Sequence, residues 1–349
     1  MILGLDIGGA NLKASDGERW AATQPFELWR RPDELADAIA ALVAGQAFDA
    51  VTVTMSGELA DCYASKAEGV ARIVAACERV ADGRPVLVWQ TAGEFVGPAT
   101  ATEFWPLTAA SNWHVQATWA ARCDPNAAAV LVDAGSTTTD VIPIERGLPV
   151  AAGQTDVARL KSCELIYAGI GRTPATAFGS EVTLRDDAGV PVRWSLVPEF
   201  FATTADIWQV AEGTVANDDA SNETPDRRSQ TLAAARHRLA RQLCADECEL
   251  PSGVLDAVAA ELRDRQLRRT LDAIVLARGR CGGTAAVTFV LSGSATPLLA
   301  AVATHFAADD AVRCVRLADV LSTDIAAAAG AFATAVLASE RVTLASARA

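Results

Sequence analysis

The sequence predicts an α/β fold of two domains, built from mixed sheets flanked by helices, and three observations support this fold class. Apolar, β-branched segments alternate along the chain with amphipathic segments of helical period. Residues 2–14 and 128–144 share one pattern: an apolar run, an Asp, a turn of small residues and a second run. The chain of 349 residues is long enough for two domains of ordinary size. We expect a first domain over residues 1–124 and a second over 125–349.

The first domain is predicted to begin with two strands, at residues 2–7 and 10–15, on either side of a Gly-containing turn. Residues 31–45 form an amphipathic pattern opened by Pro and Asp, which is typical of a helix. A buried strand within 47–61, a helix over 66–81 and a strand over 84–90 should follow. Because a helix connects two of these strands, part of the sheet should be parallel, and ligands bind at the carboxyl ends of such strands.

The second domain is predicted to repeat this arrangement and to carry a helical insertion around residues 199–285. Strands are expected at 128–133, 138–144 and 148–152, and a hairpin over 180–198 should turn at Asp187, Ala188 and Gly189. We also expect a polar and mobile loop at 217–229, and a strand, turn and helix over 287–302. The Ala-rich segment 324–338 is too short for a membrane span, so we expect a buried helix near the hinge between the domains.

The two Asp-led turns are the strongest candidate phosphate sites. Tight turns present unpaired backbone N–H groups that attract anions, and small residues let a phosphate approach them. Asp6 and Asp133 are the first candidates for catalysis and for holding Mg²⁺, usually through water. The alternative is two ordinary hairpins in which each Asp only stabilises its turn. The candidate phosphate-binding residues are Gly8, Gly9, Asn11, Lys13, Gly135, Ser136, Thr137, Thr138 and Asp140.

Two further polar segments could act on a substrate. Residues 53–70 leave a buried strand and offer Glu58, Asp61 and Lys66, a group that could bind a polar substrate or accept a proton. The alternative is a solvated loop with capping acids. Residues 106–123 place Asn112 and His114 just before a helix, where a phosphate contact or a general base competes with a plain N-cap.

The remaining polar segments lie at residues 153–174 and 200–213. Arginine suits a phosphate or carboxylate because its donors form a planar fork. Helix capping and surface ion pairs are the alternative roles. The candidate binding residues here are Thr155, Asp156, Arg159, Arg172, Thr203, Thr204 and Asp206, and the turn within 287–302 adds Gly293.

Composition excludes several classes of function. The net charge of −13 argues against a nucleic-acid surface, which needs clustered Lys and Arg. No basic segment of a signal peptide precedes the first strand, and no membrane span is evident, so we expect a cytoplasmic protein. The eight cysteines lack C-x-x-C spacing, which favours reduced thiols over a zinc site.

The order of these motifs resembles the actin-like superfamily of sugar kinases and heat-shock ATPases over nearly the whole chain. In that superfamily two Asp-led phosphate hairpins precede a Gly-containing turn near the nucleoside, here the turn of VTFVLSGSATPLLAAV. The resemblance implies two ribonuclease-H-like domains with the ligand in the cleft between them. It also raises ATP as a candidate ligand.

A narrower resemblance rests on LGLDIGGANLK, FELWRRPDELA, TMSGELADCYASKAEGV, ASNWH, VDAGSTTTDVIP, YAGIGRTP and FATTADIW. Together these segments resemble the hydantoinase/oxoprolinase-like proteins linked to tetrahydromethanopterin-dependent C1 transfer. Archaeal members condense an aminomethylfuran diphosphate with the phenol of γ-glutamyltyramine in methanofuran biosynthesis. The resemblance implies that reaction, with release of pyrophosphate, on a γ-glutamyltyramine- or tyrosine-type phenol.

This chemistry is compatible with the candidate residues. The two turns with Mg²⁺ would stabilise the leaving diphosphate, and Glu58, Asp61 or His114 could accept the phenol proton. Two alternatives stay open: an ATP-dependent kinase or ATPase that uses the same turns, and a non-catalytic, nucleotide-sensing scaffold of the C1 pathway. The expected partners are small molecules, and the chain could form a homodimer.

Overall fold

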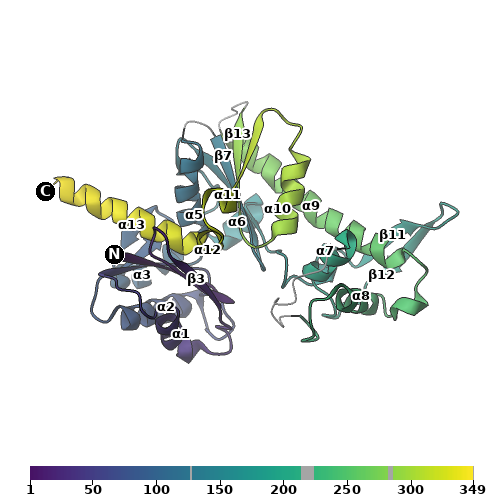
Figure 1. The fold of residues 1–349 in the computed structure, drawn as a ribbon, viewed down its shortest axis with the longest axis horizontal. Coiled ribbons are helices and arrows are strands. Elements are labelled where there is room, and N and C mark those ends of the chain that lie inside the picture. The colour runs from purple at the N-terminus through teal and green to yellow at the C-terminus, as the bar shows by residue number, and fades with distance from the viewer. Residues whose placement is uncertain (126–127, 214–223, 282–285, 349) are drawn as a thin grey trace.

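The computed structural model describes residues 1–125, 128–213, 224–281 and 286–348, and its ribbon shows two sheets with helices around each (Figure 1). The first sheet has the strand order β3-β2-β1-β4-β5-β6. Its strands are β1 (Ile2–Ile7), β2 (Asn11–Ser15), β3 (Ala21–Pro25), β4 (Ala50–Met55), β5 (Val86–Gln90) and β6 (Glu94–Val96). Strands β1, β4 and β5 are parallel, whereas β2, β3 and β6 pair antiparallel with their neighbours. The sheet is therefore mixed, as predicted.

Helices cover the first sheet, and the sequence predicts one of them with its observed bounds. Helix α2 spans Lys66–Ala81, as expected, and the Ser65 hydroxyl accepts a hydrogen bond from the Glu68 backbone N–H at its start. Helix α1 spans only Leu35–Leu42, because residues 32–34 form a 3₁₀ turn ahead of it. The others are α3 (Pro98–Glu103), α4 (Trp105–Thr108) and α5 (Asn112–Ala120).

The second sheet has the order β10-β8-β7-β13-β14, with β9 paired to β8. Its strands are β7 (Ala128–Ala134), β8 (Thr139–Glu145), β9 (Leu148–Pro149), β10 (Leu165–Ile166), β13 (Val287–Ser292) and β14 (Val312–Arg316). Strands β7, β13 and β14 are parallel, and β8 is antiparallel to β7. Helices α6 (Asp156–Ser162), α10 (Thr296–His305), α11 (Leu317–Val320) and α12 (Thr323–Ala327) accompany it. Both sheets thus begin with an Asp-led antiparallel hairpin.

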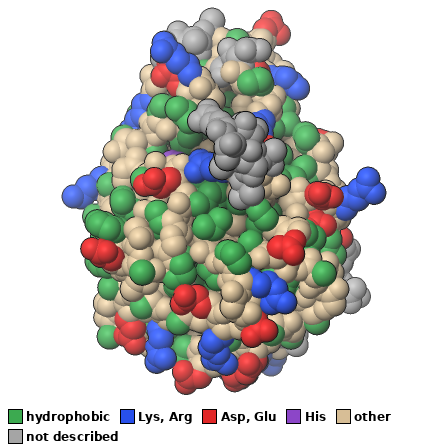
Figure 2. Space-filling model, turned by 90° about the vertical axis from the view of Figure 1, so that its left-hand side faces the viewer, with side chains coloured by type: hydrophobic (Ala, Val, Ile, Leu, Met, Phe, Trp, Pro, Cys, Tyr) green, Lys and Arg blue, Asp and Glu red, His purple; other side chains and the backbone are tan. Residues whose placement is uncertain are grey.

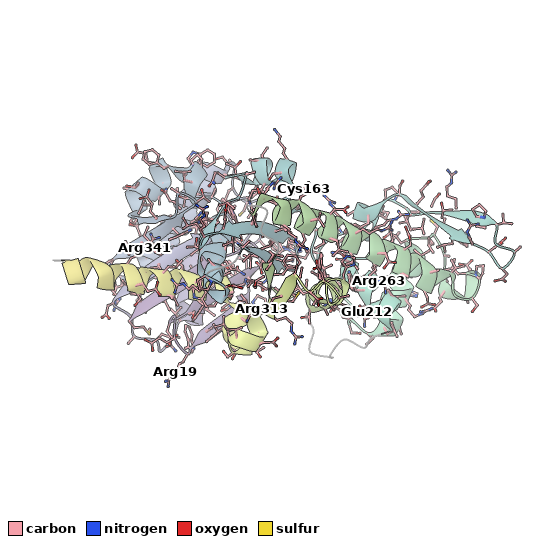
Figure 3. All side chains as sticks on the ribbon, turned by 90° about the horizontal axis from the view of Figure 1, so that it is seen from above. Arg19, Cys163, Glu212, Arg263, Arg313 and Arg341 are labelled. Atoms are coloured by element: carbon pink, nitrogen blue, oxygen red, sulfur yellow. The ribbon has the colours of Figure 1, made fainter. Side chains whose placement is uncertain are left out.

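Residues between β10 and β13 extend away from the second sheet as a largely helical lobe (Figure 1), which begins before the insertion predicted around 199–285. The lobe contains the predicted hairpin, β11 (Glu181–Arg185) and β12 (Pro191–Ser195), followed by α7 (Thr204–Glu212), α8 (Leu232–Arg241) and α9 (Val254–Arg280). Seen from above, α9 runs from the second sheet out to this hairpin (Figure 3), and α7 packs against it. Of the predicted loop at 217–229, residues 217–223 lie outside the described part of the chain.

The Ala-rich C-terminal segment forms two helices rather than the single one predicted. Helix α12 ends at Ala327, and α13 (Ala329–Arg348) crosses back over the first sheet (Figure 1). A side chain at Gly4 of β1 would collide with the Ala331 carbonyl, so α13 approaches the sheet through small residues. Residues of α5, α13, β5 and the second sheet share one hydrophobic cluster, which therefore lies between the two sheets.

The surface is of mixed charge. On the face drawn in Figure 2, acidic and basic side chains are interspersed with hydrophobic ones, and no continuous basic area forms on that face. Within the described residues, no helix combines the length and the apolar character that crossing a bilayer requires.

Candidate active site

Both Asp-led turns open onto one cavity of about 300 Å³ between the two sheets. Gly9 lines it from the β1–β2 turn, and Thr137 and Thr138 line it from the β7–β8 turn. The segment that leaves the carboxyl end of β4 adds a third wall. The predicted site residues that line the cavity are Gly9, Glu58, Asp61, Asn112, Thr137, Thr138, Asp140, Asp156, Arg159 and Arg172. Parallel strands explain this convergence, because their carboxyl ends meet at one edge.

The first turn is built around Asp6 and Lys13. These residues lie opposite each other in the β1–β2 register, with Lys13 Nζ 3.5 Å from Asp6 Oδ2. Burial raises the pKa of Asp6, the Lys13 charge opposes this shift, and the nearby Asp133 charge adds to it. Asp6 Oδ1 is buried without a hydrogen-bond partner. Gly8 closes the turn by donating its N–H to the Asn11 carbonyl at 3.1 Å.

The second turn is tied to a distant loop. The Gly135 N–H donates to the Thr138 carbonyl, and the N–H groups of Ile170 and Arg172 donate to the carbonyls of Gly135 and Ser136 at 2.9 and 3.0 Å. A side chain at Gly169 would collide with the Gly135 carbonyl, which explains the glycine there. The loop 169–172 is thus held directly against the turn and carries Arg172 into the cavity.

A chain of alternating charges crosses the cavity wall. Lys66 Nζ lies 3.5 Å from Glu58 Oε1 and 2.5 Å from Asp156 Oδ2. Arg159 then pairs with Asp156 at 2.9 Å and with Asp140. Lys66 starts α2 beside the first sheet, whereas Asp156 starts α6 beside the second. The chain of ion pairs therefore joins the two halves of the molecule.

Burial shifts the pKa values of the carboxyl groups at the two ends of this chain in the same direction. Burial raises the pKa of Glu58, and the Lys66 charge opposes this shift. Burial likewise raises the pKa of Asp140 to about 6, which the Arg159 charge opposes and the Asp133 charge reinforces. Glu58 Oε2 is buried and has no hydrogen-bond partner. Glu58 thus presents an unpaired carboxylate oxygen on a residue that lines the cavity.

Aromatic rings support the guanidinium groups. Arg159 lies over Trp113 with its Cζ 4.6 Å from the ring centre, and Arg172 lies over Trp29 at 4.3 Å. Trp29 and Tyr167 also line the cavity. Trp29 is not among the site residues predicted from the sequence. The signal available was local: a tryptophan followed by two arginines, in a segment with neither strand nor helix pattern.

His114 lies outside the lining of the cavity. It is on α5, between Trp89 and Trp113, with ring centres 5.7 and 5.2 Å away. Its Nδ1 accepts a 3.3 Å hydrogen bond from Trp89 Nε1. Burial, with a smaller effect of the Arg341 charge, lowers the pKa of His114 to about 4. The bases that the structure brings to the cavity are carboxylates.

Several other predicted residues do not line the cavity but cap helices or hold loops next to it. Thr155 caps α6 by accepting from the Ala158 N–H, and Thr203 with Asp206 forms the capping box of α7. Asp206 is also paired with the buried Arg238 at 2.6 Å. Thr204 Oγ1 donates to the Gly169 carbonyl at 2.7 Å and accepts from the Gly171 N–H, so it holds the loop that carries Arg172.

Gly293 packs closely against the end of β7, which leads into the second turn. It has φ +102°, and a side chain there would collide with the Ala134 carbonyl at the end of β7. Gly293 does not line the cavity. The other predicted residues outside its lining, besides His114, are Asp6, Gly8, Asn11, Lys13, Lys66, Asp133, Gly135, Ser136, Thr155, Thr203, Thr204 and Asp206. Within the described residues, no cluster of three or more His, Cys, Asp or Glu side chains is arranged to hold a metal ion.

Solved structures of known proteins share this fold. The nucleotide-free structure of acetone carboxylase aligns with a TM-score of 0.54 and 12% identity, over 96% of this chain and 70% of that chain. This similarity concerns the fold alone. The predicted fold class, two mixed sheets flanked by helices, is confirmed.

Sequence comparison is more specific. The chain is 36% identical over 249 residues to the (4-{4-[2-(γ-L-glutamylamino)ethyl]phenoxymethyl}furan-2-yl)methanamine synthase of Methanocaldococcus jannaschii, covering 70% of this chain and 72% of that protein. It is also 36% identical over 117 residues to the protein of the same name from Methanococcus vannielii, covering 34% of this chain and 50% of that one. The model of the hydantoinase/oxoprolinase family matches residues 49–339. This chain therefore belongs to the hydantoinase/oxoprolinase family.

Proposed function

We propose that this protein is a biosynthetic transferase that joins an aminomethylfuran diphosphate to a phenol of the γ-glutamyltyramine or tyrosine type. The products are an aryl ether and pyrophosphate. Two relatives at 36% identity are named as synthases of such an ether. The observation that carries the proposal is the convergence of both small-residue turns on one cavity lined by carboxylates.

The leaving diphosphate is assigned to the two turns. Gly9 has open space where its side chain would be, so an oxygen can approach the backbone there. Thr137 and Thr138 face the same cavity, and Arg172 adds a positive charge. Together these groups would stabilise the negative charge that develops on the diphosphate as its bond to carbon breaks.

Magnesium is proposed as the cofactor, and the residues present are compatible with it. Asp6 has a buried oxygen without a partner, and its pKa is raised by burial and, to a smaller extent, by the Asp133 charge, against the effect of Lys13. A cation beside the two carboxylates would offset the missing partner and the repulsion between them. Mg²⁺ commonly binds one or two carboxylates together with substrate phosphates. When bound there it would supply positive charge to the leaving group.

The carbon centre carries positive charge in the proposed reaction. The C–O bond to the diphosphate breaks with its electron pair on oxygen, leaving a furan-stabilised cation at the methylene carbon. Carboxylate oxygens of the lining residues would stabilise that cation where they face it. The carboxyl groups of the lining are Glu58, Asp61, Asp140 and Asp156, and its guanidinium groups are Arg159 and Arg172. The phenol oxygen then bonds to the methylene carbon.

Glu58 is the proposed general base. The phenol has an ordinary pKa of about 10, so its proton must leave as the ether forms. Glu58 lines the cavity, has one free oxygen and has a raised pKa, which brings it nearer to the pH at which a base works well. Asp61 also lines the cavity but is exposed, which makes it the second choice.

The test compares two substrate pairs on the purified protein with Mg²⁺. One mixture holds the aminomethylfuran diphosphate and γ-glutamyltyramine or tyrosine; the other holds ATP and the same phenol. We expect pyrophosphate and an ether, identified by mass, only in the first. Asp6→Asn should abolish turnover, while the exposed Glu103→Gln should not change it. Release of ADP or orthophosphate from ATP would instead make the protein a kinase or ATPase. Full activity of the Asp6 variant would disprove the assigned site.

A further inference from the structure

Arg172 carries a positive charge that no carboxylate in the described part of the chain neutralises. The other guanidinium of the cavity lining belongs to Arg159, which pairs with Asp140 and Asp156. Among the ion pairs of the described residues, none involves Arg172. Its guanidinium instead lies over the ring of Trp29, with Cζ 4.3 Å from the ring centre. A cation held in this way keeps its charge available for an anion in the cavity.

The contact between Trp29 and Arg172 joins the two halves of the molecule. Trp29 follows Leu28, whose N–H donates to the Gly9 carbonyl, so the tryptophan is attached to the first turn. Arg172 donates its own N–H to the Ser136 carbonyl, so it is attached to the second turn. Both side chains line the cavity. The stacked pair therefore lies across the cavity from one phosphate-binding turn to the other.

The loop that carries Arg172 is fixed rather than free. Gly171 has φ +142°, and a side chain there would lie 3.3 Å from Ser136 Cβ. The Thr204 hydroxyl accepts from the Gly171 N–H at 3.3 Å and donates to the Gly169 carbonyl at 2.7 Å. The guanidinium is thus positioned before any ligand binds, which reduces the entropic cost of recognition.

We propose that Arg172 and Trp29 form a clamp that selects a diphosphate over a monophosphate. Arg172 pairs with the second phosphate of a group whose first phosphate lies at the turns. Trp29 is a positioning residue that holds the guanidinium plane. This inference rests on the proposed function, because it names the group on the substrate that the same site recognises. The planar fork of arginine suits two phosphate oxygens at once, which a single lysine ammonium does not.

The test measures binding of inorganic pyrophosphate and of orthophosphate to the full-length protein with Mg²⁺, by calorimetry and by tryptophan fluorescence. We expect pyrophosphate to bind at least about tenfold more tightly than orthophosphate, the size of one charge-assisted contact. Arg172→Gln should remove this preference and leave orthophosphate binding nearly unchanged. Arg172→Lys should restore only part of it. Trp29→Phe should remove the fluorescence change and raise KM for the diphosphate substrate without lowering kcat.

The matched control is Arg193→Gln, at an exposed arginine of the distant β12 strand. It should bind pyrophosphate as the unchanged protein does, and thermal melting should show that every variant is folded. Unchanged pyrophosphate binding by Arg172→Gln would overturn the clamp. Equal weakening for both anions would also overturn it, since Arg172 would then be a general anion contact. An Arg172-dependent preference for pyrophosphate without ether synthesis would retain the clamp and reject only the proposed function.

Discussion

Lys66 Nζ donates a 2.5 Å hydrogen bond to Asp156 Oδ2, so the first residue of α2 is bonded to the first residue of α6 across the cavity. The same ammonium lies 3.5 Å from Glu58, the proposed base. One side chain thus connects the two halves of the molecule and contacts the proposed base.

Glu58→Gln should lower kcat by about a hundredfold or more, because general-base catalysis contributes roughly 10² to 10⁴ in rate. The amide keeps the size of the side chain but cannot accept the phenol proton. Steady-state kinetics with the furan diphosphate and phenol measure the effect. A rise in KM with kcat unchanged would make Glu58 a binding residue. The kcat of Asp61→Asn would then test Asp61 as the base.

Lys66→Met should move the acidic limb of the kcat/KM profile to higher pH. Burial raises the pKa of Glu58 and the Lys66 charge holds it down, so removing that charge raises the pKa further. A base works only when deprotonated, and the rising limb therefore shifts upward. Lys161→Met, at an exposed position of α6, is the control. If the acidic limb lies at the same pH in both variants, the Lys66 charge does not control the pKa of the base.

His114→Leu should cost stability but leave the pH profile of activity in place. The change leaves the buried Trp89 N–H without its acceptor, at a cost of about 1–3 kcal/mol. The pKa of His114 is lowered to about 4 from 6.5, so the unfolded chain takes up a proton first as pH falls. The stability that the neutral ring contributes is therefore present above pH 6.5 and is lost as pH falls toward 4.

Chemical denaturation at pH 8 and at pH 5 measures this effect. The gap between the unchanged protein and the His114→Leu variant should be wider at pH 8. The control is His305→Leu, on the exposed side of α10, which should stay within about 0.5 kcal/mol. A hundredfold loss of kcat, or loss of the acidic limb, in the His114 variant would return histidine to the list of candidate bases.

Arg159→Met should destabilise the fold by about 3–5 kcal/mol at pH 8, because it leaves the buried Asp140 carboxylate without its cation, whereas Asp156 keeps Lys66. The pKa of Asp140 is about 6 even with Arg159 present, and it rises further when the cation is lost. Below that pKa the carboxyl is neutral, so the deficit should shrink as pH falls to 5. Thermal melts at both pH values test this. Arg316→Met removes an exposed pair and should change stability by less than about 1 kcal/mol.

Gly330→Ala should lower stability by about 1–3 kcal/mol and reduce activity as well. Its new methyl group would lie 2.7 Å from Asp6 Oδ2, so either α13 or the carboxylate must move. Gly279→Ala in α9 meets no atom within 4 Å and should be neutral or stabilising by up to about 1 kcal/mol. Unchanged melting and kcat in the Gly330 variant would show that α13 tolerates a wider spacing from β1.

The local elements could be predicted from the sequence because local rules govern them. Helix α2 has the predicted bounds, since a capping serine precedes a clear helical period. Both Asp-led hairpins form, since each apolar run is followed by small residues that permit a tight turn. The split of the last segment into α12 and α13 was not predictable in this way, because Ala328 is as favourable in a helix as its neighbours.

The candidate site was predicted as a set of segments rather than as a set of contacts. The sequence alone determined that two turns of small residues and several carboxylates follow strand ends, because spacing and residue type establish this. Only the tertiary structure decided that Lys66 bonds to Asp156, that Trp29 supports Arg172 and that His114 faces Trp89. Periodicity shows which face of an element is buried, but the partner of that face depends on the packing of segments distant in the chain. That packing, rather than any local pattern, brought the two turns and the chain of charges around one cavity.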